Sequence, residues 1–233
     1  MTAHLPDVLG QAWWDYWCNK KVDSLLLHTS YSTETEEMPV NYFFRGADFP
    51  PIERYALELC QGQVLDVGAG TGVHAAYLQQ QGLAVSTIEV SPVGVRIQRA
   101  RGIEDAVLTR YQDYTGQGYD TVLLLMNGIG IVGTLPGLRR FLRQAIGWLQ
   151  PGGQLLFDSS DIAYLYEDKP LPTQAYYGEV RYRYEYRQQQ SNWFEWLYVD
   201  FATLATVADE AEWQAQLIFQ DDNDQYLARL TRL

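Results

Sequence analysis

The sequence predicts an α/β fold: a mostly parallel sheet with helices on both faces, an N-terminal helical lid and an inserted β-hairpin. Three observations carry this prediction. A strand-like run at 63–67 leads through three glycines at alternate positions into a segment with helical spacing. A second strand-like segment follows at 84–90, and 119–126 ends in the continuous apolar run 122–126, as expected for a strand covered on both faces. From residue 180, aromatic and charged residues alternate strictly, which is typical of an antiparallel hairpin.

Composition and charge narrow the class of protein. The chain has 233 residues with 17 basic and 29 acidic side chains, a formal net charge of −12, and its basic residues form no cluster. This disfavours a polyanionic partner, so we expect no nucleic acid. Only Cys18 and Cys60 are present, which indicates neither a disulfide framework nor a metal site. The N-terminus lacks a basic segment followed by an apolar core, and no apolar run has membrane-spanning length. We expect a soluble cytoplasmic protein without a membrane partner.

The N-terminal segment is rich in aromatic residues. Trp13 and Trp17 are four residues apart, as are Leu27 and Tyr31, so 11–31 is predicted to form one or two amphipathic helices. These aromatic side chains either line a substrate pocket or pack an N-terminal helix onto the body, and packing is the favoured interpretation. A further helix begins at the adjacent prolines 50–51 and ends at Gly62.

The glycine-rich turn after the first core strand is the main candidate for a ligand site. Glycines at 68, 70 and 72 let a ligand approach the backbone, and the helix that follows offers free N–H groups to a polar or anionic ligand. A dinucleotide fingerprint would need its third glycine at position 73, which is Val73. The spacing therefore argues against a dinucleotide.

The pattern Asp66-x-Gly68-x-Gly70-x-Gly72 resembles motif I of the class I S-adenosylmethionine (SAM) dependent methyltransferases. A second stretch, 149–153, reads Leu-Gln-Pro-Gly-Gly and is similar to the turn that enters the fifth strand in that family. The resemblance covers about residues 39–160 well and the remainder by architecture. It implies a Rossmann-like sheet of seven strands with an antiparallel last strand, in a single domain. The predicted parts are a lid (1–50), a SAM-binding core with strands 1–5 (51–175), the inserted hairpin (176–200) and a C-terminal helix and strands (201–233).

The resemblance also implies which residues bind SAM. The loop backbone would cradle the amino acid end of SAM, Glu89 at the tip of the second strand would accept from the ribose hydroxyls, and Arg45 would pair with the SAM carboxylate. An ordinary surface salt bridge is the alternative for Arg45. Asp113 is the candidate acid for adenine, although Arg110 stands where the family has its acidic residue. The predicted cofactor-binding residues are Asp66, Gly68, Ala69, Gly70, Thr71, Gly72, His74, Glu89, Val90, Asp113, Asn127 and Arg45.

Methyl transfer from SAM is an in-line displacement, in which the protein mainly holds the donor and the acceptor in position. No metal is required. The weak catalytic candidates are Asn127, at the carboxyl end of the fourth strand, Tyr42 and Asp158. The paired acids Asp158 and Asp161 would serve as a base or as metal ligands, and the favoured alternative is that they include a helix cap and a solvated charge. An acceptor hydroxyl would need a base, for which His28, His74, Asp158 and nearby tyrosines are the candidates.

The sequence thus predicts a SAM-dependent methyltransferase that acts on a small molecule. Two alternatives stay open at this point. One is an NAD(P)-binding oxidoreductase, against which Val73 speaks. The other is a non-catalytic SAM-binding module. The acceptor atom and the oligomeric state are not predicted.

Overall fold

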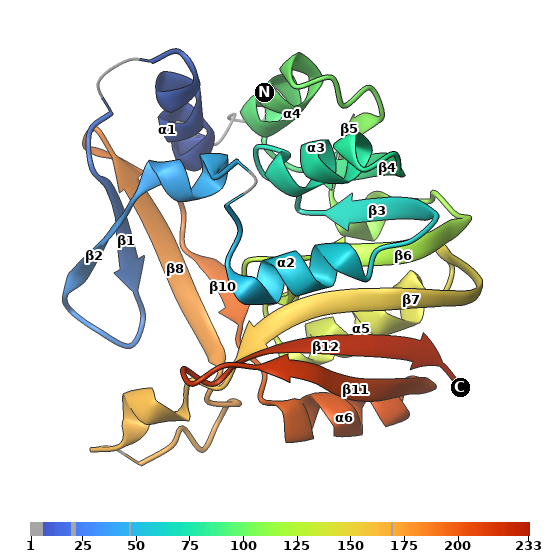
Figure 1. The fold of residues 1–233 in the computed structure, drawn as a ribbon. Coiled ribbons are helices and arrows are strands. Elements are labelled where there is room, and N and C mark those ends of the chain that lie inside the picture. Colours follow the sequence, from blue (N-terminus) through green and yellow to red (C-terminus); the bar gives the residue numbers. More distant parts are fainter. Residues whose placement is uncertain (1–6, 20–21, 47, 169) are drawn as a thin grey trace.

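The structure, a computed structural model, describes residues 7–19, 22–46, 48–168 and 170–233, so the expectation for the first six residues lies outside its range. Its main element is a seven-stranded sheet with the strand order β11-β12-β7-β6-β3-β4-β5 (Figure 1). Strands β3 to β7 pair in parallel, whereas β12 runs antiparallel to both of its neighbours. The predicted fold class, with its antiparallel last strand, is confirmed.

The strands of the main sheet are β3 (Gln63–Val67), β4 (Ala84–Glu89), β5 (Ala106–Leu108), β6 (Tyr119–Leu124), β7 (Leu149–Ser160), β11 (Trp213–Gln220) and β12 (Gln225–Arg232). The α-helices connected to them are α2 (Pro51–Glu58), α3 (Val73–Gln80), α4 (Pro92–Ala100), α5 (Leu135–Ala145) and α6 (Phe201–Asp209). Short 3-10 helices occur at η2 (Tyr111–Asp113), η3 (Gly128–Val132) and η4 (Ala163–Tyr166).

The continuous apolar strands bury both faces of the sheet because successive side chains point to opposite sides. Leu123 belongs to the core under α2 and α3, together with Ala56 and Leu78. Its neighbour Leu124 belongs to the core on the other face, under α5 and α6. Both leucines are fully buried. The helices therefore lie in two layers, one on each face of the sheet (Figure 1).

A second, smaller sheet has the order β10-β8-β1-β2, with β9 paired to β8. Its strands are β1 (Leu25–Thr29), β2 (Thr35–Met38), β8 (Glu179–Tyr186), β9 (Gln189–Gln190) and β10 (Phe194–Leu197). The N-terminal segment also contains α1 (Val8–Trp17) and the 3-10 helix η1 (Val40–Phe44). The predicted hairpin is present as β8 and β10, and the N-terminal segment adds two strands to it.

The prediction of helix across 11–31 was right for α1 and wrong for 25–29. The side chains of β1 alternate between buried and half-buried, and Leu27 lies opposite Tyr184 of β8. This strand pairing buries the leucines more completely than an isolated amphipathic helix would, so tertiary pairing overrides their helical propensity. The N-terminal lid consists of helix and sheet together.

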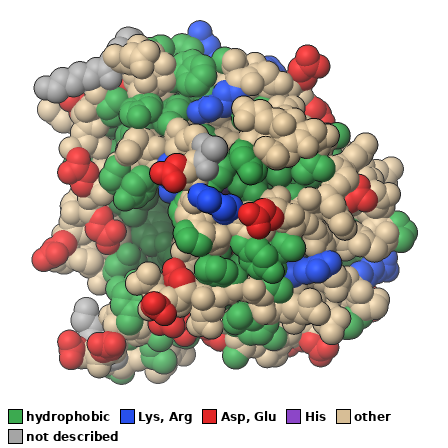
Figure 2. All heavy atoms as spheres, viewed as in Figure 1, with side chains coloured by type: hydrophobic (Ala, Val, Ile, Leu, Met, Phe, Trp, Pro, Cys, Tyr) green, Lys and Arg blue, Asp and Glu red, His purple; other side chains and the backbone are tan. Residues whose placement is uncertain are grey.

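The small sheet stands beside the carboxyl ends of the parallel strands, toward which the arrows of β3 and β7 point (Figure 1). In the space-filling view the molecule is hollowed between the small sheet and α2, and hydrophobic side chains form the walls of the recess (Figure 2). Ligands of open α/β sheets bind at this edge. Within the described ranges, no helix has the length and apolar composition needed to cross a membrane.

Candidate active site

The glycine loop connects β3 to α3 and turns tightly at the edge of the sheet. Gly68 and Gly70 have φ angles of +73° and +56°, a region that side chains with a Cβ atom rarely adopt. The amides of Gly68 and Ala69 donate to the carbonyl of Ile88 in β4, at 2.9 and 3.3 Å. The loop is therefore fixed against the neighbouring strand.

Glu89, at the end of β4, is buried and held by the backbone around it. Its carboxylate accepts hydrogen bonds from the amides of Gly70 at 2.8 Å, Val90 at 2.7 Å and Ser91 at 2.8 Å. Burial raises the pKa of the Glu89 carboxyl to about 7, although the three amide donors act in the opposite direction. Each carboxylate oxygen has two lone pairs, and the three amides occupy three of these four positions, so one position on Oε2 remains for a hydroxyl group.

A cavity of about 530 Å³ lies between this loop and the small sheet. Its wall on the side of the main sheet comes from predicted site residues, namely Asp66, Gly68, Ala69, Gly70, Thr71, His74, Glu89 and Val90. Its opposite wall comes from the small sheet, through Tyr184, Phe194, Glu195 and Trp196. Leu9 and Trp13 of α1 and Phe43 of η1 complete the lining from the N-terminal segment.

Trp13 combines the two roles that its sequence context left open. It is 3 % exposed, its ring lies 5.3 Å from that of Phe43, and it lines the cavity. Helix α1 is fixed to the small sheet by the hydroxyl of Tyr186, which donates to Asp15 at 3.0 Å. The N-terminal aromatic residues thus pack the lid and shape the cavity at once.

Asp66, the next-to-last residue of β3, has a carboxylate oxygen without a hydrogen-bond partner among the described residues, and it lines the cavity. Its Oδ2 has no hydrogen-bond partner within the part of the chain that the structure describes, and the residue is 2 % exposed. Burial raises the pKa of the Asp66 carboxyl to about 6, with a smaller opposing effect from His74. Buried polar groups normally have a partner, so this oxygen indicates a place for a ligand donor.

His74 lines the cavity and is tied to a buried ion-pair network. Its Nε2 lies 2.8 Å from Oε2 of Glu53 in α2, and the other oxygen of Glu53 accepts from Arg45. Burial raises the pKa of Glu53, but the contacts with His74 and Arg45 outweigh it and bring this pKa below its ordinary value. Arg45 therefore has a protein partner, where the sequence suggested the SAM carboxylate or a surface salt bridge.

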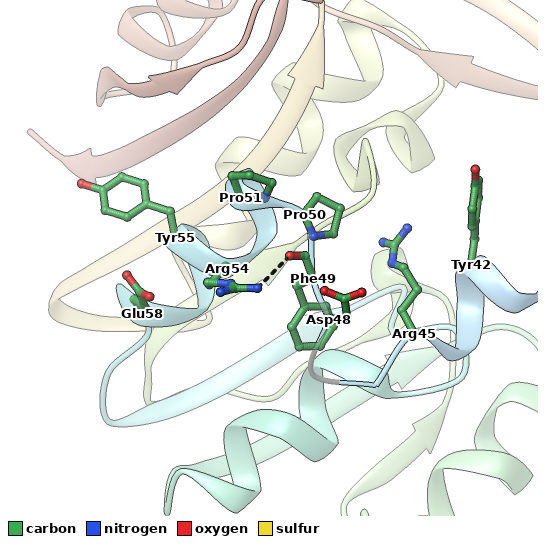
Figure 3. A pocket seen from close by; sticks show the side chains of 9 residues that line it. All are labelled: Tyr42, Arg45, Asp48, Phe49, Pro50, Pro51, Arg54, Tyr55 and Glu58. Atoms are coloured by element: carbon green, nitrogen blue, oxygen red, sulfur yellow. Dashed lines mark hydrogen bonds between the residues drawn. The ribbon is translucent and has the colours of Figure 1, made fainter.

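Arg45 and Tyr42 do not reach the described lining of the cavity. They line a separate open depression of about 720 Å³, together with Asp48 and Arg54 (Figure 3). Tyr42 is 48 % exposed, and the Arg45 guanidinium lies 5.7 Å from the centre of its ring. The described residues of this depression carry both signs of charge, and Tyr42 lies there rather than in the described lining of the cavity beside the glycine loop.

Asn127 and Asp158 form a support behind the cavity wall. The backbone N–H of Asn127 donates to Oδ2 of Asp158 at 2.9 Å. The side-chain oxygen of Asn127 accepts from the hydroxyl of Ser160 at 2.9 Å. Met126 and Asn127 have φ angles of +66° and +53°, unusual for residues other than glycine. Asp158 is fully buried within β7 and is therefore not a solvated charge, whereas Asp161 accepts a hydrogen bond at 2.9 Å from the amide of Ala163, the first residue of η4. These contacts hold Met126, which does line the cavity.

Two other predicted residues also lie outside the described lining. Asp113 is exposed in η2, whereas Arg110, Tyr111 and Gln112 line the cavity beyond Glu89. Gly72 packs inside the fold, since a Cβ atom there would lie 2.7 Å from Ile103. Of the two residues considered for adenine, the structure brings Arg110 to the cavity and leaves Asp113 on the surface.

The candidate bases occupy different places. The Nε2 of His28 lies 2.9 Å from Glu185 on the small sheet and away from the cavity lining, and His74 is paired with Glu53. Burial raises the pKa of the Asp158 carboxyl to about 6, but this group lies behind the wall. Among the described residues, no group of three or more His, Cys, Asp or Glu side chains is arranged to hold a metal ion.

Some lining residues were not identified from the sequence. Phe43, Met126 and Ile131 carry no motif, and their place depends on how the chain folds over the sheet. The hairpin aromatics did carry a signal, the alternation from residue 180 onward, which places them on one face of the hairpin. Among the described residues on that face, Tyr184, Phe194 and Trp196 reach the cavity.

The fold and this site define a class I methyltransferase arrangement, and comparisons with known proteins agree. The family profile described as "Methyltransferase domain" matches residues 44–217. A SAM-dependent methyltransferase from Bacteroides fragilis, crystallised with S-adenosyl-L-homocysteine, is 38% identical, with 98% of each chain covered and a TM-score of 0.91. The chain belongs to the methyltransferase domain family, and the predicted enzyme class is confirmed.

More distant structures share the fold alone. The CcbJ methyltransferase from Streptomyces caelestis is 16% identical, with 81% of this chain and 99% of that chain covered and a TM-score of 0.62. DesVI from Streptomyces venezuelae is 15% identical, with 82% and 95% covered and a TM-score of 0.60. A search among curated proteins found no match.

Proposed function

We propose that the chain transfers the methyl group of SAM to a small-molecule acceptor by in-line displacement. One observation carries this proposal: a single cavity of about 530 Å³ extends from the glycine loop and Glu89 to the aromatic side chains of β8 and β10. Its volume lies within the range of about 300–1,000 Å³ that is typical of small-molecule sites. The cavity thus offers a donor end at the loop and an acceptor end at the small sheet.

The residues at the donor end fit SAM. The glycine loop leaves backbone open to the amino acid part, the unpaired Oδ2 of Asp66 suits its ammonium group, and Glu89 suits the ribose hydroxyls. Arg110 and Tyr111 lie beyond Glu89, where the adenine would extend. When bound, SAM supplies an electrophilic methyl group on a positively charged sulfur.

Enclosure and charge support a small acceptor. Helix α1, η1 and the small sheet all contribute to the cavity wall, so the donor end lies beneath a cover. A net charge of −12 disfavours close approach of a nucleic acid. The main task of the protein is then to hold the donor and the acceptor in near-attack geometry within this cavity.

The test uses methyl-labelled SAM and a cell extract separated by size into small molecules, proteins and nucleic acids. We expect the label to enter the small-molecule fraction, and the Gly70→Val variant to transfer none. Label in the protein or nucleic acid fraction would contradict a small-molecule acceptor. Failure of SAM and of S-adenosylhomocysteine to bind would contradict the donor.

A further inference from the structure

We propose that the acceptor is an amine carried on an aromatic or alicyclic skeleton, and that it reacts as the neutral amine without a general base from the protein. This inference rests on the proposed function, since it assigns the acceptor end of the same cavity. It follows from the aromatic wall, from the lack of lysine and arginine among the described residues of that wall, and from the positions of the titratable groups.

The acceptor end is a wall of rings from one face of the small sheet. The ring centres of Tyr184 and Phe194 are 5.4 Å apart, and those of Phe194 and Trp196 are 6.2 Å apart. Tyr182 continues the array at 6.2 Å from Phe194. Such surfaces bind apolar skeletons.

Anionic acceptors do not fit this end. Among the described lining residues, the only arginine is Arg110, which lies at the donor end beyond Glu89, and there is no lysine. Two carboxyl groups, Asp66 and Glu89, share the same cavity. An acceptor carboxylate, phosphate or thiolate would therefore lack a cationic partner and would face negative charge.

The carboxylate of Glu195 does not change the charge that faces an acceptor at this end. It lies directly opposite Arg181 on the neighbouring strand, so its side chain leaves the sheet on the face away from Phe194 and Trp196. A Cβ atom added to Gly133 would lie 3.3 Å from its Oε2, which places the carboxylate beside Gly133, a residue that is not among the described lining residues.

A hydroxyl acceptor would need a base at this end, and the described residues supply none. His74 is engaged by Glu53, His28 lies on the small sheet away from the lining, and Asp158 lies behind the wall. Burial raises the pKa of the Tyr184 phenol, so it stays protonated near neutral pH. Asp66 and Glu89 are at the donor end. Alcohols are weak nucleophiles without a base, whereas a neutral amine has a free lone pair.

The step is balanced without any further reactant. The amine loses its proton to water before it binds, and its nitrogen lone pair forms a bond to the methyl carbon. The bond between that carbon and the donor sulfur breaks, and its electron pair stays on sulfur as the thioether of S-adenosylhomocysteine. The product is the N-methylated ammonium, which carries the positive charge that the sulfonium brought.

The test compares probes of matched skeleton: benzylamine with benzyl alcohol and benzoate, and cyclohexylmethylamine with its alcohol and its carboxylate. Release of S-adenosylhomocysteine measures turnover, and calorimetry on the protein loaded with S-adenosylhomocysteine measures binding without turnover. We expect binding and turnover of at least one amine, and of neither the alcohols nor the carboxylates. For two substituted benzylamines of different pKa, the break in kcat/KM against pH should move with the amine.

Two variants test whether the aromatic wall of the acceptor end binds the amine. Trp196→Ala is expected to lower kcat/KM for the amine at least tenfold, with unchanged binding of S-adenosylhomocysteine. Trp193→Ala is the matched control, because Trp193 is 43 % exposed on the same hairpin and stacks with Arg183 outside the cavity. It should behave as the wild type.

Equal turnover of an alcohol or a carboxylate, a break at a fixed pH for both amines, or no turnover of any amine by protein that binds S-adenosylhomocysteine would each overturn the proposal. Protein that binds neither SAM nor S-adenosylhomocysteine would instead overturn the proposed function itself.

Discussion

The amide of Gly70 donates a hydrogen bond to Oε2 of Glu89 across 2.8 Å, which joins the glycine loop to the tip of the neighbouring strand. The carbonyl of Gly70 also accepts from the side chain of Gln98 in α4, at 2.8 Å. The loop and the acid assigned to the ribose are therefore one rigid unit. A change at either residue should disturb the other.

Glu89 makes the stability of the unliganded protein depend on pH. Its pKa is about 7 in the folded protein and has an ordinary value of 4.5, so the folded state binds more protons between these values. Stability is highest below this window and falls as pH rises through it. Between pH 5.5 and pH 8, titration of the Glu89 carboxyl should lower the free energy of unfolding by about 2 kcal/mol.

Urea unfolding of the wild type and of Glu89→Gln at both pH values checks this prediction. The fall in unfolding free energy should be about 2 kcal/mol smaller in the variant. Asp66 and Asp158, each with a pKa raised to about 6, keep part of the dependence in both proteins. Equal slopes for the two proteins would show that Glu89 does not titrate in this range.

Gly70→Val should abolish binding of SAM and leave a folded protein. Valine is strained at a φ of +56°, and relief of the strain moves the amide that holds Glu89. Gly82→Val is the control, since Gly82 has a φ of +87° with open space around its Cβ position and lies away from the cavity lining. Calorimetry with S-adenosylhomocysteine should find binding in the control only, and retained micromolar binding by Gly70→Val would refute the role of the loop.

Gly94→Ala should weaken binding of S-adenosylhomocysteine at least tenfold. An added methyl group would lie 2.8 Å from the carbonyl oxygen of Gly70 and 3.2 Å from the ring of Trp13, so loop and lid must both shift. Gly46→Ala provides the comparison, because nothing lies within 4 Å of its Cβ position. If the two variants bind equally well in calorimetry, the loop does not depend on this close packing.

Glu53→Gln should destabilise the protein by about 3 kcal/mol, because it leaves Arg45 and His74 without their shared carboxylate in a buried place. Glu210→Gln removes one partner of the exposed ion pair with Arg139 and should have a much smaller effect. Unfolding in urea measures both. A similar loss in the two variants would mean that burial of the network contributes little.

The core of the fold could be predicted because its signals are local in the sequence. The alternate glycines, the acid at the tip of β4 and the turn at 151–153 are each contained within a few residues. The pairing of β1 with β8 is different, since it joins His28 to Glu185 across 157 positions. No pattern within 25–29 indicates such a partner, and its leucines suit a helix equally well.

The candidate site was predicted best where the backbone defines it. Loop residues such as Gly68 and Gly70 reach the cavity because the turn itself forms the wall. The side chains of Arg45 and Asn127 can pair with either a ligand or a protein group. In the structure Arg45 pairs with Glu53, and Asn127 accepts from Ser160. A sequence gives the type of a side chain but not which partner is nearest in space.

Calorimetric titration of the wild type and of Glu89→Ala with S-adenosylhomocysteine, and of the wild type with NADH, tests the assignment of the cavity most directly. We predict saturable binding of S-adenosylhomocysteine to the wild type, a loss of about 1–3 kcal/mol in Glu89→Ala from the unmade ribose hydrogen bonds, and no binding of NADH. Binding of NADH without S-adenosylhomocysteine, or an unchanged dissociation constant in Glu89→Ala, would contradict it.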